Sequence, residues 1–163
     1  MSSLILEEID HFETIVGPLF RRKFGTDGPP DNWPHHLCAF AQVAPGQLAL
    51  LGYVHFGTFG DTCLVGGMCT NGDALRQLPD ALRDEFKAAG GVAVQMLRFG
   101  FQRFANQFAG FFGIVGDPRA LEVDLAAGFE LTEHHQLVRF LPRPLPPDHV
   151  RALTAKVLAL GSF

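Results

Sequence analysis

Apolar residues recur near the start of the chain with the spacing of a helix. Over residues 7–24 they fall every three or four positions, and the segment begins acidic and ends basic, which suits the helix dipole. Gly17 and Pro18 predict a kink or a division within this helix. Residues 25–36 are rich in Gly and Pro, so they predict a loop, and they hold the chain's single tryptophan.

Three apolar runs then follow, over residues 37–43, 48–59 and 62–70, with the turn sequences APGQ and GD between them. Short apolar runs separated by turn residues are typical of strands joined in hairpins. The pattern therefore predicts an antiparallel meander of three strands.

Helices and strands alternate in the second half of the chain. We expect a helix over residues 72–89, with Asp73 as N-cap and a second start near Pro79, and then a glycine-led helix that ends at about Ala105. A strand, a short helix and a last strand are expected over residues 108–116, 118–127 and 129–141. This order predicts an α/β fold with an antiparallel front half.

A proline-rich linker, residues 142–147, precedes a segment over 148–160 in which apolar residues again have helical spacing. This last helix packs either on its own domain or on a second subunit, so a homodimer is one of the alternatives. The chain of 163 residues suits a single domain over 1–163, with a core at about 4–141.

Composition and charge narrow the classes of partner. Apolar residues make up 47% of the chain and include sixteen Phe, enough for a substantial core. The formal net charge is −4, and no basic run is longer than three residues, which argues against a nucleic-acid partner. No apolar run is long enough to span a membrane, and the N-terminus lacks a signal-peptide pattern.

The cysteines and histidines predict a reduced, metal-free protein. Cys38, Cys63 and Cys69 are an odd number without a secretory signal, so we expect a cytoplasmic protein with free thiols. Cys63 and Cys69 are too far apart in sequence for a close metal pair, and the His residues lack ligand spacing.

The stretch AAGGVAVQML, residues 88–97, places two glycines directly before an apolar helix. Two interpretations stay open at this point. Gly90 and Gly91 end one helix and let the next begin, or they bare a helix N-terminus so that a ligand phosphate can reach its amides. Small residues at 88, 89 and 93 extend the region without bulky side chains.

The order of elements, together with the sequence GDPRALEVDLAAGFELTEH at 116–134, resembles the GNAT acyltransferase superfamily. In that family a glycine-containing loop and helix bind the pyrophosphate of acyl-CoA, and a later short helix starts near an Asn and ends in Gly-Phe. Asp117 stands at the usual Asn, Ala120 at the usual Ala, and Gly128-Phe129 at the Gly-Phe. The resemblance implies a mixed, mostly antiparallel central sheet flanked by helices, here with an additional C-terminal helix.

The resemblance also implies an acyl-CoA-dependent N-acyltransferase, with acetyl-CoA as cosubstrate and a small-molecule or peptide amine as acceptor. The residues that it implies for cofactor binding are Gly67, Met68, Ala89, Gly90, Gly91, Val92, Ala93 and Asp117. The family polarises the thioester carbonyl with a backbone amide, which places the acyl group near Gly67, Met68 and Cys69. Gly66-Gly67 marks either a bulge that frees an amide or close packing against a Phe.

The sequence offers a candidate for the general base but lacks two residues that the family usually has. His55 is the candidate for the general base. Apart from Tyr53 and the cysteine thiols, it is the only titratable residue of the three meander strands. The family's loop has Gln or Arg where Ala88 stands, and Lys87 is one place away. Asp124 stands where many members have a Tyr that protonates the departing thiolate, and we expect it to be a solvated residue on an exposed helix face.

These departures keep two rivals open. One is a catalytically silent GNAT-like domain that acts as a CoA-binding or protein-interaction module. The other is an unrelated α/β hydrolase or ligand carrier. If the protein were a hydrolase, Cys63 or Cys69 would be the nucleophile, paired with His55.

Overall fold

The computed structural model describes residues 3–29 and 33–163; residues 30–32 of the predicted loop, like residues 1–2, lie outside this range. The described strands are β1 Leu4–Glu8, β2 His35–Ala44, β3 Gln47–Phe59, β4 Thr62–Thr70, β5 Gly110–Ile114, β6 Glu130–Leu131 and β7 Leu137–Phe140. The described helices are α1 Phe12–Phe24, α2 Gly72–Gln77, α3 Asp80–Ala88, α4 Val92–Phe104, α5 Pro118–Ala127 and α6 Pro147–Leu160.

The strands form one sheet in the order β1-β2-β3-β4-β5-β7-β6. The meander β2-β3-β4 is antiparallel as predicted, and β1 adds to it antiparallel. Among the described strands, β4 and β5 make the one parallel pair, and β5, β7 and β6 continue antiparallel. The prediction of a mixed, mostly antiparallel sheet flanked by helices is confirmed.

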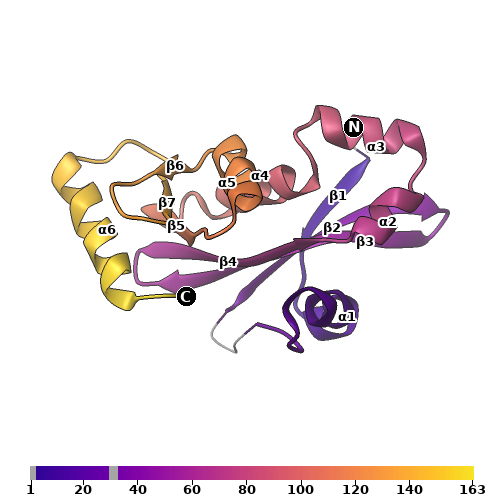
Figure 1. Ribbon diagram of the computed structural model, residues 1–163, viewed down its shortest axis with the longest axis horizontal. Helices are drawn as coiled ribbons and strands as arrows, with labels where there is room; N and C mark the ends of the chain where they lie inside the picture. The colour runs from indigo at the N-terminus through magenta and orange to yellow at the C-terminus, as the bar shows by residue number, and fades with distance from the viewer. Residues whose placement is uncertain (1–2, 30–32) are drawn as a thin grey trace.

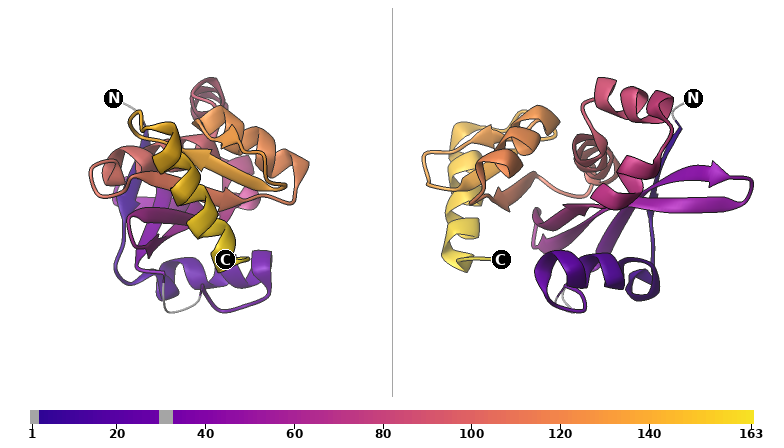
Figure 2. Two further views of the ribbon diagram at one scale, coloured as in Figure 1. Left: turned by 90° about the vertical axis from the view of Figure 1, so that its left-hand side faces the viewer. Right: turned by 45° about the vertical axis from the view of Figure 1, so that its right-hand side comes forward.

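Helices cover both faces of this sheet (Figures 1 and 2). The main core lies under α2, α3, α4 and α5, where Val54, Phe56 and Phe111 of the sheet meet Met96 and Leu97 of α4. On the opposite face, α1 packs through Val16 and Phe20 on Cys38, Tyr53 and Cys69. Alternate residues of each strand therefore serve two separate cores.

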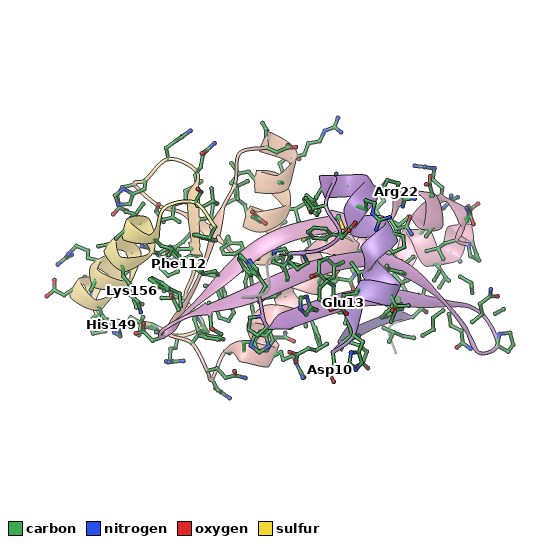
Figure 3. The ribbon with its side chains drawn as sticks, turned by 90° about the horizontal axis from the view of Figure 1, so that it is seen from below. Asp10, Glu13, Arg22, Phe112, His149 and Lys156 are labelled. Carbon is green, nitrogen blue, oxygen red and sulfur yellow. The ribbon has the colours of Figure 1, made fainter. Side chains whose placement is uncertain are left out.

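The C-terminal helix α6 packs on its own chain. Leu153 and Val157 of α6 join Phe112 and Leu137 of the sheet in a third buried cluster. Figure 3 shows Lys156 of α6 beside the β3–β4 end of the sheet, where its Nζ lies 2.7 Å from Asp61 Oδ1. Of the two alternatives for this helix, the structure supports packing on the chain's own sheet.

The prediction of a helix over residues 7–24 is wrong at its start. Residues Leu4–Glu8 form the edge strand β1, and the helix begins only at Phe12. These residues form a strand because pairing with β2 lets Leu4 and Leu6 pack into the main core. Glu8 secures the strand, because its carboxylate pairs with His35 of β2 at 2.7 Å and with Arg103 of α4.

Two other predicted elements are divided. The helix over 72–89 splits into α2 and α3 because Pro79 holds the preceding Leu78 in an extended conformation, with ψ at 149°. The strand over 129–141 is interrupted between β6 and β7 by a turn in which Gln136 has a φ of 65°. Pro18, by contrast, lies inside a continuous α1.

Candidate functional site

A cavity opens where the parallel strands β4 and β5 separate. Their pairing ends at Val65 and Gly113, although β4 continues to Thr70. The cavity there has a volume of about 310 Å³. Its walls come from β4, β5, α4, α5 and Phe163 after α6, and they include Gly66, Gly67, Met68, Leu97, Gly113, Asp117, Ala120 and Asp124.

A β-bulge in β4 forms one wall of this cavity. Val54 pairs with Met68 but Phe56 pairs with Val65, so His55 alone faces the two residues Gly66 and Gly67. A methyl group on Gly66 would overlap the His55 imidazole and lie 2.9 Å from the Trp33 ring. The bulge predicted from the two glycines is therefore present, and the close approach of His55 and Trp33 explains why Gly66 has no side chain.

The amide that this bulge exposes is bound by His55. The backbone N–H of Gly67 donates to His55 Nε2 at 2.9 Å, so Nε2 uses its lone pair inside the protein. His55 is 4% exposed, its Nδ1 has no partner within the described residues, and Trp33 packs edge-on against the ring. Burial, with a smaller contribution from His36, lowers the pKa of His55 to about 4.

This geometry removes two roles that the sequence suggested. A histidine whose accepting nitrogen is engaged, and whose other nitrogen is buried, cannot take a proton from an amine in the cavity. The Gly67 amide likewise does not point a free N–H at an acyl oxygen. His55 is better described as the residue that holds the bulge.

The other acyl-site residues lie on different faces of β4. Gly67 and Met68 line the cavity. Cys69 faces α1 in the cluster with Tyr53, away from the cavity lining, and burial raises the pKa of its thiol to about 11. Cys63 is buried in the main core, so neither thiol is placed as a nucleophile near His55.

The glycine pair at residues 90–91 ends α3. The amides of Ala89, Gly90 and Gly91 donate to Glu85 O, Lys87 O and Phe86 O, at 3.1, 3.0 and 2.8 Å. Both glycines have a φ of 94°, a conformation that other residues rarely adopt. Of the two interpretations of these glycines, this geometry favours the helix end, and it leaves their amides already paired.

The amides that remain at the start of α4 belong to the next residues. Gly91 is the N-cap and offers no capping side chain, and the first helical bond runs from Gln95 N to Gly91 O at 3.2 Å. The N–H groups of Val92 and Ala93 therefore have no partner inside the helix. Ala93 lies one turn before Leu97, which lines the cavity.

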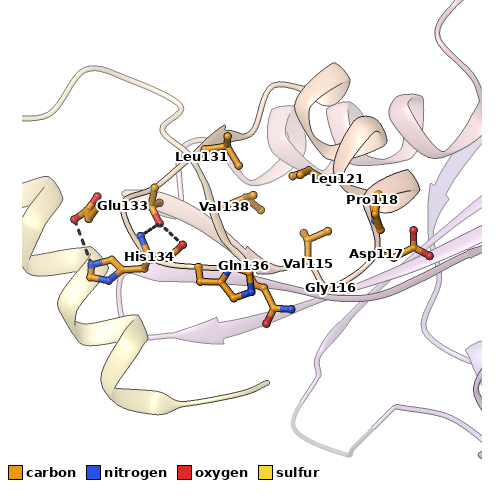
Figure 4. Close-up of a pocket in the computed structure, with 12 residues that line it drawn as sticks. Val115, Gly116, Asp117, Pro118, Leu121, Leu131, Glu133, His134, Gln136 and Val138 are labelled. Atoms are coloured by element: carbon orange, nitrogen blue, oxygen red, sulfur yellow. Dashed lines mark hydrogen bonds and ion pairs between the residues drawn. The ribbon is translucent and has the colours of Figure 1, made fainter.

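Asp117 caps α5 and stands between two cavities. Its carboxylate accepts from Arg119 N at 2.7 Å, as an N-cap side chain does. A second cavity, of about 540 Å³, shares Val115, Gly116 and Asp117 with the first and continues to the β6–β7 turn (Figure 4). In that turn, His134 Nε2 lies 3.3 Å from Glu133 Oε1, and both residues line the second cavity.

Asp124 does not lie on an exposed helix face, so that expectation is wrong. It is 8% exposed, and its side chain belongs to the cavity lining with Ala120 and Phe129. Burial raises the pKa of its carboxyl group to about 6. The sequence holds a signal for this placement, because Ala120, Asp124 and Ala127 recur at helical spacing and share the inner face of α5.

Residues 3–29 and 33–163 contain no group of three or more His, Cys, Asp or Glu side chains arranged to hold a metal ion. In the same range, no helix combines the length and the apolar character that crossing a bilayer requires.

Solved structures with the same arrangement of elements come from GNAT acetyltransferases. Tetrahymena GCN5 superposes with a TM-score of 0.53 at 8% identity, over 87% of this chain and 98% of that one. A GNAT family acetyltransferase from Brucella melitensis, in complex with acetyl-CoA, gives 0.51 at 10% identity over 90% and 93%. A GNAT family acetyltransferase from Staphylococcus aureus gives 0.51 at 10% identity over 86% and 99%.

By sequence, no protein-family model and no curated protein matches the chain. The structural likeness therefore establishes the fold, which is that of the GNAT superfamily, at a sequence identity too low to transfer a substrate.

Proposed function

Because the chain has the GNAT fold, we propose that it is an acyl-CoA-dependent N-acyltransferase, with acetyl-CoA as the simplest donor and a primary amine as acceptor. The observation that carries the proposal is the cavity between β4 and β5, with a two-glycine bulge on its wall. A gap between diverging parallel strands admits a narrow thioester arm alongside backbone amides. The acetyl-CoA complex of the Brucella melitensis protein, which has this fold, adds support for the donor.

The start of α4 supports a place for the phosphates of the donor. Val92 and Ala93 offer amides at the positive end of a helix, where anions are stabilised without Lys or Arg. Ala93 is one turn from Leu97 and hence from the cavity. Phosphates at these amides and a thioester beside Gly67 and Met68 would then occupy two ends of one extended molecule.

The chemistry that we propose is direct attack of a neutral amine on the thioester. Since the Gly67 amide is engaged by His55, we assign polarisation of the carbonyl to the backbone of Met68. An alkylamine has a pKa of about 10.4, so the acceptor must shed a proton before it attacks. With His55 unavailable as a base, that proton passes to water, and positioning of the two substrates supplies most of the rate.

One observation favours the rival proposal of a silent CoA-binding domain. Because His55 is sequestered, the part of the described cavity wall that β4 supplies has no general base, and the carboxyl groups of that wall, Asp117 and Asp124, come from α5 and its N-cap. The two proposals share acyl-CoA binding and differ in thiol release.

The test measures binding and turnover in the same preparations. Saturating acetyl-CoA at 100 times Kd should stabilise the folded protein by about 2.7 kcal/mol, visible as a rise in Tm. Ala120→Phe fills the cavity from α5 and should abolish this rise, whereas Ala126→Phe, exposed on the same helix, should preserve it. Thiol release from acetyl-CoA with a panel of amines then supports the enzyme, and binding without release supports the silent domain.

A further inference from the structure

A third cavity, which we call the apolar cavity, lies between the β3–β4 end of the sheet and the end of α6. Its volume is about 360 Å³, within the range of about 300–1,000 Å³ that is usual for small-molecule sites. The polar residues of its described lining are Thr58 and Ser162, and neither is charged. The apolar side chains that line it are Trp33, Leu64, Leu160 and Phe163. Such walls favour an apolar group over an ion.

The apolar cavity adjoins the cavity between β4 and β5. Phe163 lines both, because the chain after α6 turns at Gly161 toward the β3–β4 end of the sheet (Figure 1). The Trp33 ring also reaches from one to the other. A methyl group on Gly57, in the apolar cavity, would lie 2.8 Å from Trp33 Cε3, and one on Gly66, in the first cavity, would lie 2.9 Å from Cη2.

The cavity between β4 and β5 therefore has two neighbours of different chemistry. The cavity of about 540 Å³ presents Asp117, Glu133 and His134, which suit a polar or cationic group. The apolar cavity has no charged side chain among its described lining residues. An amine that arrives as an ammonium ion is poorly served there, whereas a hydrocarbon chain gains the full benefit of leaving water.

The strand β4 sets the distance that such a chain would cover. Met68, where we assign the thioester carbonyl, and Leu64, in the wall of the apolar cavity, are four residues apart on β4, at most about 13 Å. An acetyl group at Met68 ends within the first cavity. A longer, unbranched acyl group continues from the same carbonyl past Phe163.

We propose that the donor is a CoA thioester of a medium-chain acyl group, such as octanoyl, whose tail occupies the apolar cavity. This inference rests on the proposed function and names the class of its donor. Trp33, Leu64, Leu160 and Phe163 then determine specificity for the chain, through contact with its methylenes. Each methylene that leaves water should raise the affinity about fourfold, so burial of only three of them predicts a gain of about 50-fold.

The first experiment measures binding by calorimetry with four ligands. These are CoA, acetyl-CoA, octanoyl-CoA and suberoyl-CoA, whose chain has the length of octanoyl but ends in a carboxylate. Octanoyl-CoA should bind at least about 50-fold more tightly than acetyl-CoA. Suberoyl-CoA should lose most of this gain, because the apolar cavity offers its carboxylate no cation among the described residues.

The second experiment locates the tail. Trp33 is the chain's single tryptophan and lines the apolar cavity, so its emission reports on that cavity alone. An octanoyl-CoA that carries bromine on its last carbon should quench this emission on contact, and unbrominated octanoyl-CoA should not. Quenching by a bromine-tipped octylamine in the presence of acetyl-CoA, without quenching by the brominated thioester, would assign the cavity to the acceptor and overturn the proposal.

The third experiment uses two leucines of the last turn of α6. Leu160 lines the apolar cavity, whereas Leu158 does not, and their exposed fractions are similar, 41% and 39%. Leu160→Gln places an amide in the wall and should weaken octanoyl-CoA binding about tenfold, with the affinity for CoA unchanged. Leu158→Gln is the matched control and should bind all four ligands as wild type does.

The outcomes separate this inference from the proposed function. Failure of wild type to bind CoA and acetyl-CoA overturns both. If these two ligands bind but octanoyl-CoA binds no more tightly, or its brominated tail leaves Trp33 unquenched, the medium-chain donor is wrong and the proposed function stands. Equal octanoyl-CoA affinities of Leu160→Gln and Leu158→Gln would likewise overturn the inference alone.

Discussion

The imidazole of His55 accepts a hydrogen bond from the backbone of Gly67, at 2.9 Å, across the bulge that shapes the cavity. This bond engages the Gly67 amide and His55 Nε2, the two groups that the sequence suggested for acyl transfer. It also fixes the tautomer, because an accepting Nε2 leaves the proton of the neutral ring on Nδ1. His55 thus positions the β4 backbone while staying uncharged.

The neutral state of His55 predicts a loss of stability in acid. The folded protein holds the pKa of His55 near 4, against 6.5 in the unfolded chain, so between these values the unfolded chain binds the extra proton. The free energy of unfolding should therefore fall by up to about 3 kcal/mol as pH drops from 6.5 to 4. Urea denaturation at several pH values measures it. His55→Gln should reduce this dependence of the free energy of unfolding on pH. His135→Gln, on the exposed β6–β7 turn, should leave the dependence unchanged.

Gly66 should not tolerate a side chain. An added methyl group would overlap the His55 ring and press on Trp33, so Gly66→Ala should cost about 1–3 kcal/mol of stability. Gly17→Ala is the matched control, because its methyl group on α1 would meet only Asp27 O at 3.9 Å. That control should be neutral or stabilising, by up to about 1 kcal/mol. Equal stabilities of the two variants would contradict the packing described for the bulge.

Gly91 should be needed for its backbone conformation. With a φ of 94° and a ψ of 163°, it occupies a region that is essentially limited to glycine, although no atom lies within 4 Å of an added methyl group. Gly91→Ala should therefore lower the free energy of unfolding by about 1–3 kcal/mol. If the variant were as stable as wild type but failed to bind acetyl-CoA, the glycine would instead serve ligand approach.

Asp124 should reduce the stability of the protein at alkaline pH. Burial raises its pKa from 3.8 to about 6, so the folded state binds more protons than the unfolded chain between these values, and stability falls as pH rises through them. Asp124→Asn removes this cost and should raise stability at pH 8 by up to about 3 kcal/mol. Thermal unfolding at pH 4 and pH 8 is the measurement. A variant that is destabilised equally at both values would show that the carboxyl group serves packing.

Elements with a local signal are predictable from the sequence. The meander between turn residues, the Asp117 cap and the Gly128 stop are all present as expected. The edge strand β1 is not, because its five residues fit a helix equally well and only pairing with β2, far along the chain, decides between the two. The division at Pro79 follows a local rule, because proline restricts the residue before it, and the sequence predicts a second helix start there.

The site is less predictable because it depends on register. Gly66 and Gly67 indicate a bulge, but which side chain faces it follows from the pairing of β3 with β4, and that side chain is His55. The same applies to Asp124, whose burial requires α5 to turn its Ala120 face toward β4 and α4. The sequence singles out Gly67 and Met68 of the cavity wall, whereas the place of Asp124 in that wall follows only from how α5 packs.

Amide resonances of the nitrogen-labelled protein during an acetyl-CoA titration test the central claim most directly. The account predicts saturable shifts at Gly66, Gly67 and Gly113, which line the cavity between β4 and β5. Gly25, after α1, and Gly46, in the β2–β3 turn, should stay unchanged. Absence of shifts at saturating acetyl-CoA, or shifts that leave these three glycines unaffected, would contradict an acyl-CoA site in this cavity.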